Sequence, residues 1–138
     1  MSTSADGAPI RGERPLRALD ERRAETMARL CELIVPGSAS VGPVVYVDAV
    51  VTSMPPPVRE GALAAIDALA AAAEQGTEAL AKQERTPEFA FVRALAVEAY
   101  YSDFVAPGRD GPGAWEAIDF NSPLATRLAK DWSWLRIA

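Results

Sequence analysis

The sequence predicts an all-α protein, a small helical bundle of about four to five helices with an irregular, aromatic-rich C-terminal tail. Two observations predict this fold class. Apolar residues recur at three- and four-residue steps in several segments, which is the spacing of one helix face. Proline and glycine residues separate these segments, and both residue types end helices. With 138 residues, the chain is expected to bury one moderate core.

We expect three parts along the chain. Residues 1–15 are rich in Ser, Gly, Pro and mixed charge, so they predict a flexible N-terminal arm. Residues 16–123 are expected to form the helical domain. Residues 124–138 are expected to form a C-terminal docking tail.

The first two helices are predicted from apolar stripes and proline stops. A stripe that begins near Leu16 is ended by Pro36 and Gly37, and it contains Leu19, Met27, Leu30, Cys31 and Ile34. The next segment, GPVVYVDAVVTSM, has the valine content of a strand. Pro43 near its start favours a short helix, as does a stripe of Val44, Val47, Val51 and Met54. The run Pro55, Pro56 and Pro57 predicts an extended break after it.

Two further helices follow in the sequence. The segment VREGALAAIDALAAAAEQG predicts one helix that stops at Gly76, with Leu63, Ile66, Leu69, Ala70 and Ala73 on its core face. TEALAKQ predicts another turn or two. The last major helix is predicted to begin with Thr86 as N-cap and Pro87 at its first position, and to run to about residue 102. Its core stripe is Phe89, Val92, Leu95, Ala96 and Ala99.

The rest of the domain is predicted to be mostly irregular. DFVAPGRDGPG is a loop by its turn residues, AWEAI predicts a helical turn, and DFNSP is irregular. Asn121 or Ser122 is suited to cap a C-terminal helix. The glycines of GRDGPG are interpreted as a turn, because no Lys-Ser/Thr pair follows them as in a phosphate-binding loop.

Composition excludes several classes of function. The sequence has no histidine, which removes a Ser-His-Asp or Cys-His triad, an imidazole metal site and a histidine general base. The single cysteine, Cys31, lies in an apolar helical register and is expected to be a buried, inert thiol. The net charge of −5 argues against nucleic acid or an anionic membrane as partner. We therefore assign no catalytic, cofactor-binding or metal-binding residue.

Targeting signals and membrane spans are not predicted either. Arg22 and Arg23 precede AETMARL rather than an unbroken apolar segment, which fits neither a secretory nor a twin-arginine signal. The apolar runs are too short to cross a bilayer. These features predict a cytoplasmic protein.

The acidic residues are expected to lie at the surface rather than to act as catalytic acids or metal ligands. Glu21 and Glu25 lie beside several arginines, so we expect a solvated, charge-balanced helix face. Asp48 and Asp67 each lie within an apolar helix, and exposed positions are expected for both.

The aromatic residues are the strongest indication of function. The candidate partner-interface residues are Tyr100, Tyr101, Phe104, Trp115, Phe120, Trp132 and Trp134. Core packing is an equally good explanation for Trp115, Phe120 and one tyrosine, because a small core needs large side chains. Trp132 and Trp134 lie near the end of the chain, where residues are usually polar, and we favour partner docking over packing back onto the domain.

Several short motifs resemble those of one family. LCELIVPGSAS (residues 30–40) resembles the helix and Ile-Pro-Gly that open the gluconate 2-dehydrogenase subunit 3 family. VVYVDAVV (residues 44–51) is similar to that family's second helix, whose aspartate corresponds to Asp48. EAYYSDF and GAWEAIDFNSP resemble its tyrosine-rich helix end, the following Trp and a leucine-glycine-tyrosine…proline stretch, with residues 118–120 and Pro123 in the corresponding places.

The resemblance covers roughly residues 16–123 and implies a non-catalytic helical subunit. Its partner would be a large flavoprotein of the glucose-methanol-choline oxidoreductase type, which holds FAD and the catalytic histidine. This sequence departs from the family in two ways: no export signal is visible, and DFVAPGRDGPG is longer than the compact loop of the family. We therefore expect a cytosolic complex acting on a sugar, glycoside or related alcohol.

Two other functions remain open. The chain could be a stand-alone small-molecule-binding or regulatory protein with a pocket lined by Tyr100, Trp115 and Phe120. It could also be an enzyme that uses carboxylates alone, with Asp103 and Asp119 as the candidates, although no pair with a raised pKa can be identified from sequence.

Overall fold

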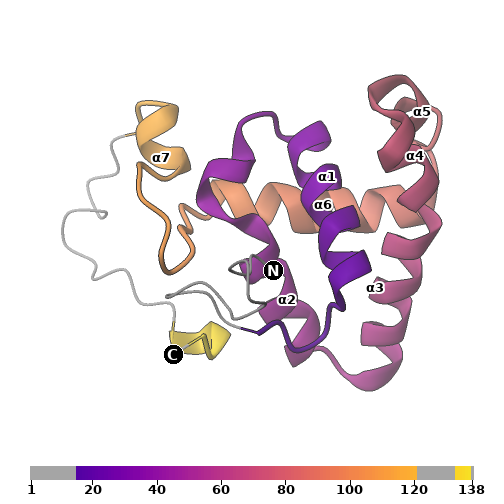
Figure 1. The fold of residues 1–138 in the computed structure, drawn as a ribbon, viewed down its shortest axis with the longest axis horizontal. Helices are drawn as coiled ribbons and strands as arrows, with labels where there is room; N and C mark the ends of the chain where they lie inside the picture. The colour runs from indigo at the N-terminus through magenta and orange to yellow at the C-terminus, as the bar shows by residue number, and fades with distance from the viewer. Residues whose placement is uncertain (1–14, 121–132, 138) are drawn as a thin grey trace, which may run out of the picture.

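The described part of the chain is mostly helical. A computed structural model describes residues 15–120 and 133–137, and no strand occurs among them, which confirms the predicted all-α class. Figure 1 shows α6 (Pro87–Tyr101) crossing behind α1 (Glu21–Ile34), α2 (Pro43–Ser53) and α3 (Pro56–Ala68), and α6 packs against all three. None of the described helices is both long and apolar enough to cross a membrane.

Short elements complete the fold at its two ends. They are η1 (Ser38–Val41), α4 (Ala70–Gln75), α5 (Thr77–Ala81), α7 (Ala114–Ala117) and η2 (Ser133–Leu135). Figure 1 shows α4 and α5 at one end of the molecule and α7 and η2 at the other. The loop after α6 also lies at the end that holds α7.

Helix α1 begins later than the apolar stripe predicts. Asp20 is its N-cap, and the Asp20 carboxylate accepts a hydrogen bond from the Arg23 N–H at 2.8 Å. The preceding residues, 16–19, are not helical, although Leu19 is buried in the core. The sequence-based start near Leu16 is therefore wrong, because an N-cap side chain fixes where a helix begins. The helix ends at Ile34, just before Pro36 and Gly37, which were predicted to end it.

The valine-rich segment forms α2, as its proline and stripe predicted. Gly42 precedes the helix with φ of 64°, and Pro43 occupies the first helical turn. At its other end, the Arg59 guanidinium donates hydrogen bonds to the carbonyls of Val51, Thr52 and Met54. Arg59 thus caps the end of α2, where the last carbonyls of a helix lack the full set of intrahelical partners.

The predicted third helix differs from the structure at two points. Only Pro55 is extended, with ψ of 147°, whereas Pro56 and Pro57 lie in the first turn of α3. The extended break predicted for all three prolines is wrong, since the first helical turn needs no N–H donor. The helix is also interrupted at Leu69, with φ of −96° and ψ of −1°, before α4 begins. Gly76 ends α4, and α5 supplies the predicted extra turn.

Helix α6 begins and ends where the sequence predicts. The Thr86 side chain accepts a hydrogen bond from the Phe89 N–H at 3.1 Å, and Pro87 follows in the first turn. The buried stripe of α6 is Val92, Leu95, Ala96 and Ala99, with Phe89 partly buried against the core. The cap and the stripe are both confirmed.

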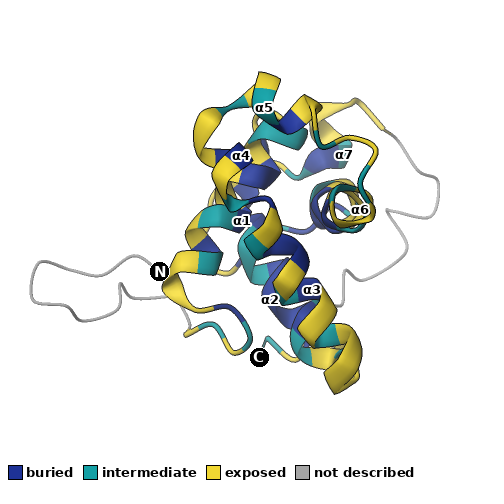
Figure 2. Ribbon diagram, turned by 90° about the vertical axis from the view of Figure 1, so that its right-hand side faces the viewer, coloured by how far each residue is buried: buried dark blue, intermediate teal, exposed yellow. Residues whose placement is uncertain are grey.

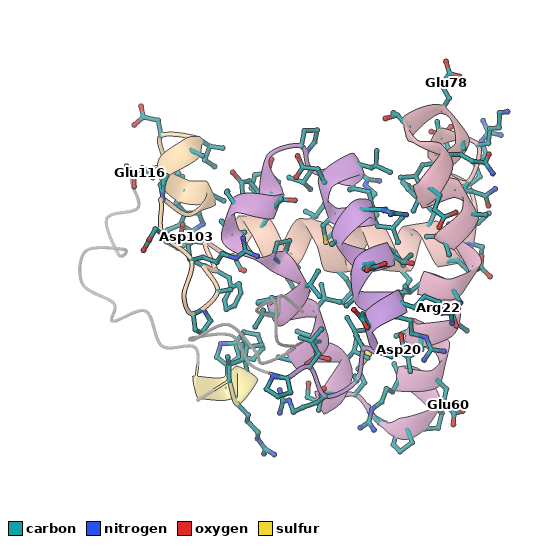
Figure 3. The ribbon with its side chains drawn as sticks, in the orientation of Figure 1. Asp20, Arg22, Glu60, Glu78, Asp103 and Glu116 are labelled. Atoms are coloured by element: carbon teal, nitrogen blue, oxygen red, sulfur yellow. The ribbon has the colours of Figure 1, made fainter. Side chains whose placement is uncertain are left out.

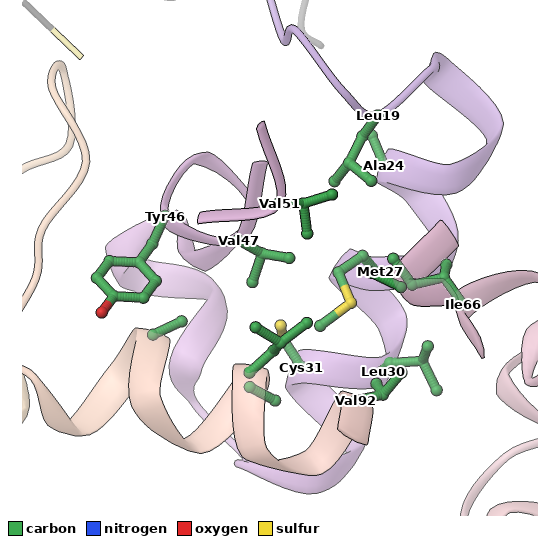
Figure 4. Close-up of a cluster of buried hydrophobic side chains, with 14 of the residues drawn as sticks. Leu19, Ala24, Met27, Leu30, Cys31, Tyr46, Val47, Val51, Ile66 and Val92 are labelled. Carbon is green, nitrogen blue, oxygen red and sulfur yellow. The ribbon is translucent and has the colours of Figure 1, made fainter. Parts of the chain in front are cut away.

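The core lies where α1, α2 and α6 meet. Figure 4 shows Met27 and Cys31 of α1 in the same cluster as Val47 of α2 and Val92 of α6. Cys31 has no exposed surface, as predicted. In Figure 2, exposed residues are concentrated on the outer sides of the helices. The candidate site is therefore carried by a well-packed scaffold.

Candidate partner-docking site

The aromatic residues near the end of α6 form two groups. In the inner group, the Tyr46 ring contacts Phe104 at a centroid distance of 5.3 Å and Trp134 at 5.9 Å, both edge to face. Phe104 is only 1% exposed. The prediction that Phe104 belongs to a partner interface is therefore wrong, because the loop after α6 buries its ring against Tyr46 of α2.

Tyr46 was not identified from the sequence as a site residue. Its hydroxyl donates a hydrogen bond to Glu98 Oε1 at 2.7 Å, which joins α2 to α6. Burial, and then the hydrogen bond to Glu98, raise the pKa of Tyr46 above its ordinary value. The phenol therefore stays protonated at neutral pH and acts as a structural donor.

The outer aromatic cluster consists of Tyr100, Tyr101, Trp115 and Phe120. Tyr100 and Tyr101 pack edge to face at 5.0 Å, and Trp115 and Phe120 do so at 5.4 Å. The indole N–H of Trp115 donates to the Tyr101 carbonyl at 3.0 Å and connects the two pairs. The structure thus brings together four of the predicted interface residues.

Much of this cluster faces solvent. Tyr101 is 45% exposed and Phe120 is 51% exposed, while Tyr100 and Trp115 are half-buried. Ile118, which the aromatic pattern could not single out, is 53% exposed beside them in the sequence. Exposed aromatic side chains that contact one another, as in this cluster, are typical of interaction surfaces.

Asp103 fixes the position of α7. Its backbone lies in the left-handed region, with φ of 65°, and its side chain is buried. Asp103 Oδ1 accepts a hydrogen bond from the Trp115 N–H at 3.2 Å. Gly113 lies so close that a Cβ there would collide with Asp103 Oδ1. Asp103 therefore holds Trp115 in place, whereas Asp119 is exposed after the end of α7.

Asp48 is buried, which contradicts the exposed position expected for it. Its carboxylate accepts backbone hydrogen bonds from Arg17, Ala18 and Leu19 at 2.8–3.1 Å. A buried carboxylate needs such partners to offset its lost hydration. Asp48 therefore anchors the segment that precedes α1.

The acidic residues of α1 lie on a solvated face, as predicted, whereas Asp67 is less exposed than expected. Glu21 and Glu25 are exposed. Asp67 is paired with Arg23 at 2.9 Å and with Arg22 at 3.6 Å, so this carboxylate is partly covered. Figure 3 shows Asp20 and Arg22 at the surface near the start of α1.

The C-terminal segment packs back onto the domain. Leu135 is buried, and its carbonyl accepts a hydrogen bond from Arg17 Nη2 at 3.2 Å. Trp134 contacts Tyr46 but remains 57% exposed, so docking of a partner on this indole stays a prediction. Trp132 lies outside the described residues, as do Asn121, Ser122 and Pro123.

A hollow of about 350 Å³ lies where residues 15–17 and 136–137 meet α2. It is lined by Pro15, Leu16, Arg17, Val45, Asp48, Arg136 and Ile137. None of the residues predicted to line a ligand pocket, Tyr100, Trp115 and Phe120, contributes to this hollow.

The chemistry offered by the described residues is limited. They contain no group of three or more side chains able to hold a metal ion. Burial raises the pKa of the Cys31 thiol to about 12, so it is not a thiolate at neutral pH.

A search of protein-family models, curated proteins and solved structures found no match to this chain.

Proposed function

We propose that this chain is a small, non-catalytic subunit that binds and stabilises a large FAD-dependent oxidoreductase of the glucose-methanol-choline type. The substrate of the complex would be a sugar, glycoside or related alcohol. The observation that carries the docking role is the outer aromatic cluster, exposed at one end of a packed helical bundle. The class of partner rests on the family resemblance of the sequence.

The physical basis is burial of aromatic surface. Tyr101, Ile118 and Phe120 together leave a large apolar area in water, and covering it contributes about 25 cal/mol for each Å² removed. A protein that binds only the native form of its partner stabilises that form by mass action. Such a subunit needs no reactive side chain of its own.

Other features of the sequence and structure support the proposal that the large subunit carries out the redox chemistry. The sequence has no histidine to act as a general base, and its single thiol is buried with a raised pKa. In the proposed complex, FAD and the residues of the large subunit carry the redox chemistry. FAD is expected in the partner and not in this chain.

Co-purification from the native host tests this proposal. The tagged chain should bring with it one large polypeptide in fixed ratio, and the eluate should show the visible absorption bands of oxidised flavin. A matched variant, Phe120→Ser with Ile118→Ser, should recover less of the flavoprotein while keeping wild-type helicity. A colourless monomer from the wild-type purification would refute the proposal.

The hollow beside α2 favours a second candidate, a stand-alone small-molecule-binding protein. Two arginines, several apolar side chains and Asp48 line it, and the Asp48 carboxylate already accepts backbone hydrogen bonds. The arginines suit a small carboxylate with an apolar body. Calorimetry of the isolated chain with a set of such acids tests this function. Saturable binding that Arg136→Ala abolishes would support it over the subunit role.

A further inference from the structure

We propose that the surface which covers the outer aromatic cluster is an apolar groove edged by Lys or Arg side chains of a different protein. A second copy of this chain does not fit the patch. The inference rests on the proposed function and names the chemistry of the partner surface. Its starting point is the pattern of charge around the exposed side chains Tyr101, Ile118 and Phe120, here called the α7 patch.

Acidic residues alternate with the apolar residues of the patch. Glu116 lies within α7 and Asp119 follows its end, and both are exposed. The salt bridges formed within the described residues involve α1, its N-cap and the α3–α4 region, and none of them uses Glu116 or Asp119. Both carboxylates are therefore available to an external cation.

Among the described residues, the nearby arginines do not pair with Glu116 or Asp119. The Arg109 side chain lies beside Gly42, at the start of α2. Its Nε would be 3.3 Å from a Cβ added to Gly42. Arg93 lies two helical turns before Tyr101 in α6. The α7 patch thus has an acidic edge.

This charge pattern decides between the possible occupants. Pairing two copies through the patch would bring Glu116 and Asp119 of each copy together as water is excluded, and like charges repel more strongly there. A partner with cationic side chains around an apolar groove gains attraction in place of repulsion. Such rim charges act mainly on the rate of association and make it depend on salt.

The test compares two variants with equal changes in charge. One carries Glu116→Lys with Asp119→Asn, where asparagine is chosen because residue 119 has φ of 54° and asparagine tolerates that conformation. The control carries Glu60→Lys with Glu78→Gln, two exposed positions that Figure 3 shows far from Glu116. Circular dichroism and thermal melting establish that both variants fold as the wild type does.

Association of each variant with the purified flavoprotein is then followed by stopped-flow fluorescence at low and high salt. At low salt, the rate constant should fall about tenfold for the α7 variant and little for the control. At high salt, the association rate constant of the wild type should fall close to that of the α7 variant. The isolated wild-type chain should remain monomeric in light scattering.

Three results would overturn the inference. Equal slowing of both variants would mean that net charge, and not the α7 patch, sets the rate of association. The proposed subunit role would then stand without this inference. Dimerisation of the wild-type chain that Phe120→Ser abolishes would make a second copy the occupant. Absence of any complex with a flavoprotein would remove the proposed function and this inference together.

Discussion

Asp48 orders the segment before α1 by accepting hydrogen bonds from three consecutive backbone N–H groups, those of Arg17, Ala18 and Leu19. Asp48→Ala would leave these donors without their acceptor in a buried place, and the unfolding free energy should fall by about 2–4 kcal/mol. Urea denaturation followed by circular dichroism measures this change. Asp48→Asn should cost less, because an amide oxygen still accepts.

Asp67→Ala is the matched control for Asp48→Ala. The Asp67 side chain is 34% exposed and its partner Arg23 is 26% exposed, so solvent screens the pair. Its loss should cost less than about 1 kcal/mol. If Asp67→Ala lowered stability as much as Asp48→Ala, the anchoring role of Asp48 would be refuted.

The Asp67 pair should also show in the pH dependence of stability. The hydrogen bond from Arg23 lowers the pKa of Asp67 below its ordinary value of 3.8. A carboxyl with a lower pKa in the folded state stabilises the protein above the unfolded pKa, and this contribution disappears as pH falls through the folded pKa. Asp67→Asn should therefore lower stability slightly at pH 7 and converge with wild type in strong acid. Urea titrations across this range measure the difference, and a gap that widens in acid would contradict it.

Single residues show which positions a sequence pattern can predict and which it cannot. Cys31 could be placed in the core because its apolar neighbours repeat with helical spacing. Asp48 could not, because its partners lie 29–31 positions earlier in the chain and are backbone groups. Phe104 could not either, since the loop that turns it inward follows no periodic pattern.

Among the elements, two glycines on different helices should respond to alanine in opposite ways. Gly61 lies in α3 with no atom within 4 Å of a Cβ placed there, so Gly61→Ala should raise stability by about 0.5–1 kcal/mol through helix propensity. Gly42, before α2, has φ of 64°, and a Cβ there would lie 2.8 Å from Ala106 Cβ. Gly42→Ala should therefore lower stability by about 2 kcal/mol or more.

Thermal melting and urea denaturation of the two variants check both signs. A neutral Gly42→Ala would mean that the junction between η1 and α2 can relax around a side chain. A destabilising Gly61→Ala would contradict the prediction, because a Cβ at Gly61 has no atom within 4 Å to collide with.

Element boundaries were predictable where local chemistry sets them. Thr86 and Pro87 form a cap and a first turn that need no tertiary partner, and α6 begins there. Gly76 ends α4 for a similar reason. The interruption at Leu69 was not predictable, because nothing local separates it from the alanine-rich residues on either side, and Leu69 is buried against the core.

At the scale of the whole molecule, the two ends of the described chain meet on α2. The segment before α1 binds Asp48, and Arg17 from that segment donates to the carbonyl of Leu135. Helix α7 lies at the same end of the molecule as η2 (Figure 1). The C-terminal segment can therefore serve two purposes, closing the fold through Leu135 and presenting Trp134.

These two purposes can be separated by neighbouring substitutions. Leu135 is 3% exposed, so Leu135→Ala should lower the unfolding free energy by about 2–3 kcal/mol through loss of buried contacts. Trp134 is 57% exposed, so Trp134→Ala should cost less than about 1 kcal/mol. In the proposed complex, Trp134→Ala should nevertheless raise the dissociation constant about tenfold, because aromatic anchors dominate binding energy.

Urea denaturation of the isolated variants and titration against the flavoprotein measure the two effects. A large loss of stability in Trp134→Ala would show that the indole closes the fold through its contact with Tyr46. Wild-type affinity in that variant would restrict docking to the α7 patch. A small stability loss with weaker binding would assign Trp134 to the partner, since an exposed ring costs little to remove until another protein covers it.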